Sequence, residues 1–342
     1  MPVASEVQEL LDSHPHLSRA RTFSEDRIDD FTSQLARYRT DDAEGLDVVA
    51  FGSLARREAT AESDFDHLVL ATRVPDDPDV AQRLLGAADE LRKRWAVEEG
   101  KEDEANKPGA SGVFGCAVGA FDLVHQIGLQ EDTNHSLTRR MLLLEESVSL
   151  LDETVHRNVI DSTLRRYLEL DRRDPTRVPR FLLNDVTRYW HTITVDYQAK
   201  ARTGVNESGL RYIKLLIPRK ILFAGTLMSL MLCGKEGWHL ATADHLREQF
   251  SITPLERLVQ ALPTVDTKVH DAMVGIVGIA DRYLERSADE EWRETVKKAS
   301  KTSTCHEFDE MREHASDLQA HLETIFFDWD LIAADSKRML AF

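Results

Sequence analysis

Residues 48–70 read VVAFGSLARREATAESDFDHLVL, and they are the most informative part of the chain. An apolar run, 48–51, leads into Gly52-Ser53, and a second apolar run, 68–70, follows Asp64-Phe65-Asp66. Alternate residues of a strand point to the same face, so Asp64 and Asp66 should project together. Two neighbouring carboxylates repel each other unless a cation lies between them. The stretch therefore predicts two strands, a glycine turn after the first, and a site for Mg²⁺ or Mn²⁺ at Asp64 and Asp66.

This pattern resembles the signature of the DNA polymerase β-like nucleotidyltransferase superfamily, a Gly-Ser turn followed after a spacer by Asp-x-Asp on a strand. The longer form, GSxxRxE…SDxD, is similar to bacterial signal-transduction uridylyltransferases and small bacterial nucleotidyltransferases. It matches Gly52 to Glu58 and Ser63 to Asp66. Arg57 departs from the pattern, because such proteins often have glycine there. The match covers about twenty residues, and the kinship slightly favours a regulatory or stress-response role.

The resemblance implies a metal-dependent enzyme that transfers a nucleoside monophosphate from a nucleoside triphosphate to an acceptor. The acceptor could be a protein, an RNA 3′ end, a small molecule or a second nucleotide. Such catalysis depends on positioning and on charge stabilisation by bound metal ions. The resemblance implies that Asp64 and Asp66 are the metal ligands. No motif in the sequence identifies the nucleobase of the triphosphate.

The residues beside the two acids have expected roles at the nucleotide. Gly52 permits close approach of the backbone to phosphate. Ser53 can donate its hydroxyl and its backbone N–H to phosphate at the start of a short helix within 52–63. Arg56 could reach the phosphates or pair with Glu58, and Ser63 could bind phosphate or cap the turn.

The superfamily resemblance also implies a third carboxylate on a later strand, flanked by apolar residues. Phe121-Asp122-Leu123 is the best match, which makes Asp122 the candidate third catalytic acid, although it could instead cap a helix. Asp132 is the second candidate, and Glu98 and Glu99 are more remote ones. The third acid usually serves as the base for the acceptor hydroxyl or as a second metal ligand.

Composition limits the setting of this chemistry. The chain has 342 residues, three widely spaced cysteines and a net charge of −17. Sparse cysteines without metal spacing, and an N-terminal stretch without the basic and apolar regions of a secretion signal, predict a cytoplasmic protein. No membrane span is expected, because the most apolar run, 221–233, is too short. The acidic charge argues against nonspecific DNA binding.

Charge is unevenly distributed along the chain. Residues 165–220 hold thirteen Lys or Arg against six Asp or Glu, a local net charge of +7. These basic residues are either solvated helix surfaces or a wall that faces a polyanion. Arg188 and Lys214, within this segment, are candidate contacts to the nucleotide.

The resemblance implies an α/β N-terminal nucleotidyltransferase domain, a small mixed sheet with helices over residues 1–155, and hydrophobic periodicity predicts an all-helical domain over 156–342. Strands are expected at 46–51, 66–72 and 112–118, and a loop at 99–112. Helices are expected at 5–40, 79–97, 137–151, 181–200, 211–233, 243–262, 265–287 and 307–342. The helical domain would bind substrate or acceptor, with the cleft between the domains.

Two alternatives to the enzyme remain open. A chain without the third acid would be a degenerate nucleotide-binding regulatory module, which binds a nucleotide and transfers nothing. A chain that uses its basic segment, 165–220, would be an RNA-binding protein, with strongly salt-dependent affinity.

Overall fold

The computed structural model describes residues 4–100, 113–171, 177–202, 208–238, 240–300 and 303–340. Its internal contacts divide the chain into two compact units. The sheet unit is Ala20–Asp171, and the helical unit combines Met1–Arg19 with Arg172–Phe342. The sequence predicts a boundary at 155/156, whereas the contacts group residues 156–171 with the sheet and the first 19 residues with the later helices.

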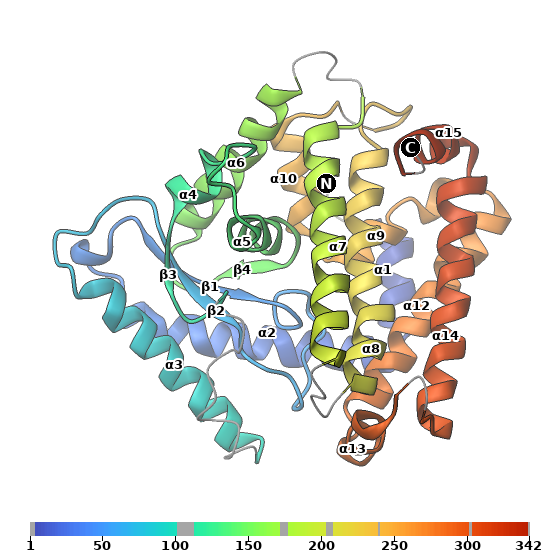
Figure 1. The fold of residues 1–342 in the computed structure, drawn as a ribbon, viewed down its shortest axis with the longest axis horizontal. Helices are drawn as coiled ribbons and strands as arrows, with labels where there is room; N and C mark the ends of the chain where they lie inside the picture. The colour runs from blue at the N-terminus through green and yellow to red at the C-terminus, as the bar shows by residue number, and fades with distance from the viewer. Residues whose placement is uncertain are drawn as a thin grey trace. The chain divides into compact units, whose positions relative to one another are not determined.

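Four strands of the sheet unit form one mixed sheet in the order β3-β2-β1-β4 (Figure 1). The strands are β1 (Leu46–Phe51), β2 (His67–Ala71), β3 (Ala117–Gly119) and β4 (Ser147–Ser149). The pair β1–β2 and the pair β1–β4 are antiparallel, whereas β2 and β3 run parallel. The helices of this unit are α2 (Pro15–Leu35, from Ala20 on), α3 (Val80–Glu98), α4 (Ala120–Val124), α5 (Asn134–Glu145) and α6 (Glu153–Leu170), with the 3₁₀ turns η1 (Ala36–Tyr38) and η2 (Asp41–Ala43).

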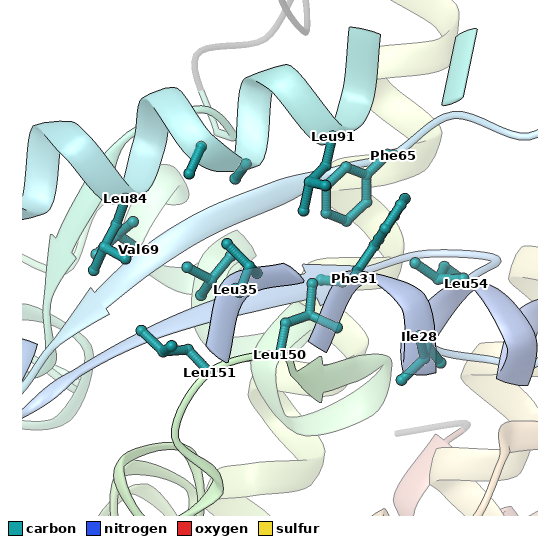
Figure 2. Packing of buried hydrophobic residues seen from close by; sticks show 14 of the residues in the cluster. Ile28, Phe31, Leu35, Leu54, Phe65, Val69, Leu84, Leu91, Leu150 and Leu151 are labelled. Carbon is teal, nitrogen blue, oxygen red and sulfur yellow. The ribbon is translucent and has the colours of Figure 1, made fainter. Parts of the chain in front are cut away.

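One face of the sheet is buried under α2 and α3. Figure 2 shows Phe31 of α2 and Leu91 of α3 gathered with Phe65, which lies just before β2. The rings of Phe31 and Phe65 are 4.7 Å apart between centroids. Burial of each such side chain contributes about 1.5–3 kcal/mol, which fixes the face that this strand presents.

The opposite face of the sheet is packed by α6, and by α5 at β4. Every residue of β1 is buried, as expected for a central strand covered on both faces. Because Phe65 points into the α2–α3 core and Asp66 pairs with Phe51 at the start of β2, strand alternation directs Asp66 to the other face.

The helical unit contains no strand among its described residues. Its helices are α1 (Ser5–Asp12), α7 (Arg180–Arg202), α8 (Ser208–Leu216), α9 (Pro218–Met231), α10 (Ala243–Ser251), α11 (Pro254–Val259), α12 (Thr267–Ser287), α13 (Glu290–Lys298), α14 (His306–Glu323) and α15 (Asp330–Leu340), with the 3₁₀ turn η3 (Leu262–Thr264) and the π-helical turn η4 (Thr324–Asp328). Pro218 opens α9 at its first turn, where its missing N–H leaves no intrahelical bond unmade. In α7, the apolar side chains of Leu182 and Val186 are buried.

Some local predictions were wrong. Of the strand expected at 112–118, only positions 117 and 118 belong to β3, and residues 113–116 form bends. Residues 52–63 form turns and no helix. Arg57 has φ +62°, a left-handed conformation that a continuing α-helix cannot contain. The predicted helix 137–151 ends at Glu145, because Ser147–Ser149 leaves it to pair with β1. The predicted loop at 99–112 lies outside the described residues except for its first two positions.

Candidate functional site

The Gly52 turn, residues Gly52–Glu58, begins where β1 ends. Gly52 has φ +71°, which L side chains rarely adopt, so glycine suits this position. The backbone N–H of Arg56 donates to Gly52 O at 2.9 Å, and that of Glu58 donates to Ser53 O at 2.8 Å. These two bonds fold the chain back within one turn, with Ser53 half-buried at its start. Because no helix follows, a helix dipole contributes nothing to anion binding at Ser53.

Asp66 lies beside this turn. The backbone N–H of Phe51 donates to Asp66 O at 3.0 Å, which extends the β1–β2 ladder by one pair. A Cβ built on Gly52 would lie 3.9 Å from Asp66 Oδ2. Asp66 is half-buried, whereas Asp64, two residues earlier and outside β2, is exposed to solvent. The fold therefore brings a glycine backbone and a carboxylate together at one end of the sheet, with a second carboxylate two residues away.

Arg56 does not extend toward Asp66 but pairs with two other carboxylates. Its Nε donates to Glu58 Oε2 at 2.7 Å, and its Nη1 donates to Glu146 Oε2. We call Arg56, Glu58 and Glu146 the Arg56 cluster. Of the two roles left open for Arg56, the ion pair with Glu58 is the one observed, and Glu146 is a partner that no sequence motif indicated.

Ser63 closes a small turn ahead of the two acids. Its Oγ accepts the backbone N–H of Thr60 at 3.0 Å, and its own N–H donates to Thr60 O at 2.9 Å. This is the capping role considered for Ser63, and it fixes the backbone that leads into Asp64.

Asp122, the first candidate for the third acid, lies at the far end of the β2–β3 pair. Gly119 of β3 pairs with Ala71, the last residue of β2, and α4 starts directly after Gly119. Asp66 precedes the other end of β2, so the five residues between them separate it from the start of α4 by roughly 16 Å at about 3.3 Å per residue. The Asp122 carboxylate accepts a hydrogen bond from Gln126 Nε2 at 3.0 Å. Asp122 is thus poorly placed to share a metal ion with Asp66.

The other acids considered are held in ion pairs. Asp132 accepts two bonds from the buried guanidinium of Arg140, and the two side chains are 3% and 0% exposed. Arg140 Nε also donates to the hydroxyl of Tyr167 at 2.6 Å. Glu98 and Glu99 both pair with Arg27. These carboxylates hold helices and loops of the sheet unit together.

Phe114 lies in the segment that leads into β3. Gly115 N–H donates to His67 O at 2.8 Å, whereas an unbroken β2–β3 register would have Cys116 donate there, so the pairing shifts by one residue before β3. This shift puts Phe114 opposite His67, and its ring packs on Phe51 with centroids 5.7 Å apart. Because Phe51 pairs with Asp66, the group that this segment brings to the end of β1 is an apolar ring. Within the part of the chain that the structure describes, no three His, Cys, Asp or Glu side chains gather as a metal site.

The basic candidates Arg188 and Lys214 belong to the helical unit. Arg188, on α7, donates from Nη1 to Asp185 Oδ1 at 2.7 Å, and the Asp185 side chain is largely buried. Lys214 lies in the last turn of α8, half-buried. Their role at a nucleotide stays a prediction.

Comparisons with protein-family models, with curated protein sequences and with solved structures gave no match for this chain. Among the described residues, no helix is long and apolar enough to cross a membrane. The resemblance to the nucleotidyltransferases therefore depends on the motif alone.

Proposed function

We propose that this protein is a nucleotidyltransferase that uses Mg²⁺ or Mn²⁺ to transfer a nucleoside monophosphate from a nucleoside triphosphate to an acceptor. One observation carries the proposal: Gly52 has a left-handed conformation, and a Cβ on Gly52 would lie 3.9 Å from Asp66 Oδ2. A triphosphate that approaches this turn would be next to the two acids of the 64–66 segment. The motif gives only the spacing of Gly52 and Asp66 along the sequence. Their proximity in the folded protein supports a shared role at a nucleotide.

The donor set fits a hard divalent cation. Asp64 and Asp66 supply carboxylate oxygens from one face of the strand, and Mg²⁺ is commonly bound by one or two carboxylates together with substrate phosphates. A metal ion bound there would neutralise charge on the phosphates and on the attacking oxygen. The role of the protein would be to hold the two carboxylates on one face and to present the N–H groups of the turn to the phosphates.

A nucleotide-binding module without transfer is the second candidate. With Phe114 packed on Phe51, the β1 partner of Asp66, and with Asp122 and Asp132 engaged elsewhere, the described residues offer no third acid as base for an acceptor hydroxyl. Such a module would bind a metal–nucleotide complex and act through that binding.

A transfer assay tests the proposal. The purified protein is incubated with each labelled nucleoside triphosphate, Mg²⁺ or Mn²⁺, and cell extract. We expect a labelled acceptor with the wild-type protein, none with Asp66→Ala, and the wild-type amount with Asp122→Asn. Metal-dependent nucleotide binding without any labelled product would favour the binding module, and full transfer by Asp66→Ala would refute the proposed site.

A further inference from the structure

The Arg56 cluster is a buried ionic connection between the Gly52 turn and the β4 edge of the sheet. The side chains of Arg56, Glu58 and Glu146 are 11%, 12% and 7% exposed. We propose, on the basis of the proposed function, that Arg56 is a positioning residue: held by Glu58 and Glu146, it fixes the turn against the strand edge and does not itself bind the triphosphate.

The start and the end of the turn are each held by other elements, and this explains why its middle needs an ionic connection. At its start the turn is continuous with β1, and just beyond its end the N–H of Ala59 donates to the buried hydroxyl of Ser24 on α2 at 3.0 Å. Glu146 immediately precedes Ser147, which pairs with Phe51, the residue before Gly52. The ion pair of Arg56 with Glu146 therefore joins the middle of the turn to the strand next to its starting point.

The charges of the cluster argue against a direct role of Arg56 at phosphate. One guanidinium faces two carboxylates, so the cluster carries a net charge of about −1 when all three groups are ionised. Burial raises the pKa of Glu58, and the Arg56 charge opposes this rise. Moving the guanidinium to a phosphate would leave two buried carboxylates without their cation, which is strongly unfavourable. The positive charge that a triphosphate requires must come from elsewhere, and the turn contributes its backbone N–H groups.

Substitutions at Glu146 distinguish the loss of a positioning role from a general loss of stability. Glu146→Ala removes the link between the turn and β4, whereas Glu146→Gln keeps an oxygen that can accept the Arg56 N–H. Asp132→Ala is the matched control, because it breaks another buried Arg–carboxylate pair of the sheet unit, on Arg140. Inorganic tripolyphosphate with Mg²⁺ serves as the probe, since it has no base to be selected. Affinity is measured by calorimetry at a temperature where circular dichroism finds every variant folded.

We expect Glu146→Ala to weaken tripolyphosphate binding by roughly tenfold or more, because the turn is no longer held in its binding conformation. Glu146→Gln should bind at least as tightly as the wild type, because its geometry is kept and a negative charge is removed. Asp132→Ala should lose stability but keep the wild-type affinity. Wild-type affinity in Glu146→Ala, or equal weakening in Glu146→Gln and Glu146→Ala, would overturn the positioning role.

Amide hydrogen exchange distinguishes failure of this inference from failure of the proposed function. A wild-type protein that does not bind tripolyphosphate counts against the nucleotide site. The cluster is then judged without any ligand. Faster exchange at the amides of 54–59 in Glu146→Ala, but not in Asp132→Ala, supports the positioning role, and unchanged exchange there refutes it.

Discussion

At the scale of single residues, backbone conformation at two positions explains the shape of the Gly52 turn. Gly52 and Arg57 both have positive φ, +71° and +62°, and they bracket the turn. Glycine adopts this conformation without steric cost, whereas an L residue has to accept strain of about 1–2 kcal/mol. The sequence therefore predicts Gly52 well, and Arg57 departs from the pattern at a position where the structure supplies a reason for glycine.

Gly52→Val should weaken binding of Mg²⁺–tripolyphosphate by more than roughly tenfold, about 1.4 kcal/mol, because a branched side chain blocks the approach of phosphate to the backbone. A Cβ alone would make only an ordinary contact with Asp66 Oδ2, so the bulk beyond Cβ matters. Calorimetric titration measures the effect. Gly128→Val is the control, since Gly128 has φ +75° and open space around it. Equal affinity in the two variants would exclude a phosphate contact at Gly52.

Arg57→Gly should change the free energy of unfolding by less than about 1 kcal/mol. Relief of left-handed strain offsets the greater freedom of glycine in the unfolded chain and the lost interactions of the guanidinium, among them the hydrogen bond from Nη1 to Ala55 O. Arg57→Val should destabilise by about 2 kcal/mol, because a β-branched residue is least tolerant of positive φ. Urea denaturation compares the free energies of unfolding of the two variants. Equal loss of stability in both would contradict backbone strain at Arg57.

At the scale of elements, Asp47 connects β1 with the junction between β4 and α6. Its side chain is fully buried, and its Oδ1 accepts the N–H groups of Leu151 and Asp152 at 2.9 and 2.8 Å. Burial raises the pKa of the Asp47 carboxyl to about 7, although the two backbone hydrogen bonds act in the opposite direction. The charged carboxylate is therefore disfavoured in the folded state relative to the unfolded chain.

This pKa predicts the pH dependence of stability. Between about pH 4 and pH 7 the folded state binds more protons at Asp47 than the unfolded state, so this group's contribution falls as the pH rises, by up to about 1.4 kcal/mol per pH unit. His156, whose pKa burial lowers to about 4, acts in the opposite direction from about pH 4 to 6.5. The difference between the wild type and Asp47→Asn isolates the aspartate. Denaturation curves over this range should show relative stabilisation of Asp47→Asn as the pH rises, and parallel curves would contradict it.

The sequence predicted best those elements whose determinants are local in the chain. The first strand and the turn after it follow from an apolar run that stops at Gly52. The strand β4 could not be predicted, because Ser-Val-Ser after a leucine-rich helix has no period of its own and becomes a strand only by pairing with β1. For the same reason Phe114 and Glu146 were missed: their places beside Phe51 and Arg56 follow from long-range pairing.

At the scale of the whole molecule, charge is distributed unequally along the chain. The net charge of −17 includes a segment, 165–220, with a net charge of +7. Most of this segment belongs to the helical unit, while Gly52, Asp64 and Asp66 all belong to the sheet unit. The sheet unit therefore contains the two carboxylates and the turn on which the proposed function depends. A direct test must examine binding at these residues.

Metal-dependent nucleotide binding is that test. Each of the four ribonucleoside triphosphates is titrated into the wild-type protein and into Asp64→Ala/Asp66→Ala, with Mg²⁺ and with excess chelator. We expect at least one nucleotide to bind the wild type only when Mg²⁺ is present, and binding to be lost in the double variant. Equal binding by both proteins, or binding that is indifferent to Mg²⁺, would contradict the proposed site.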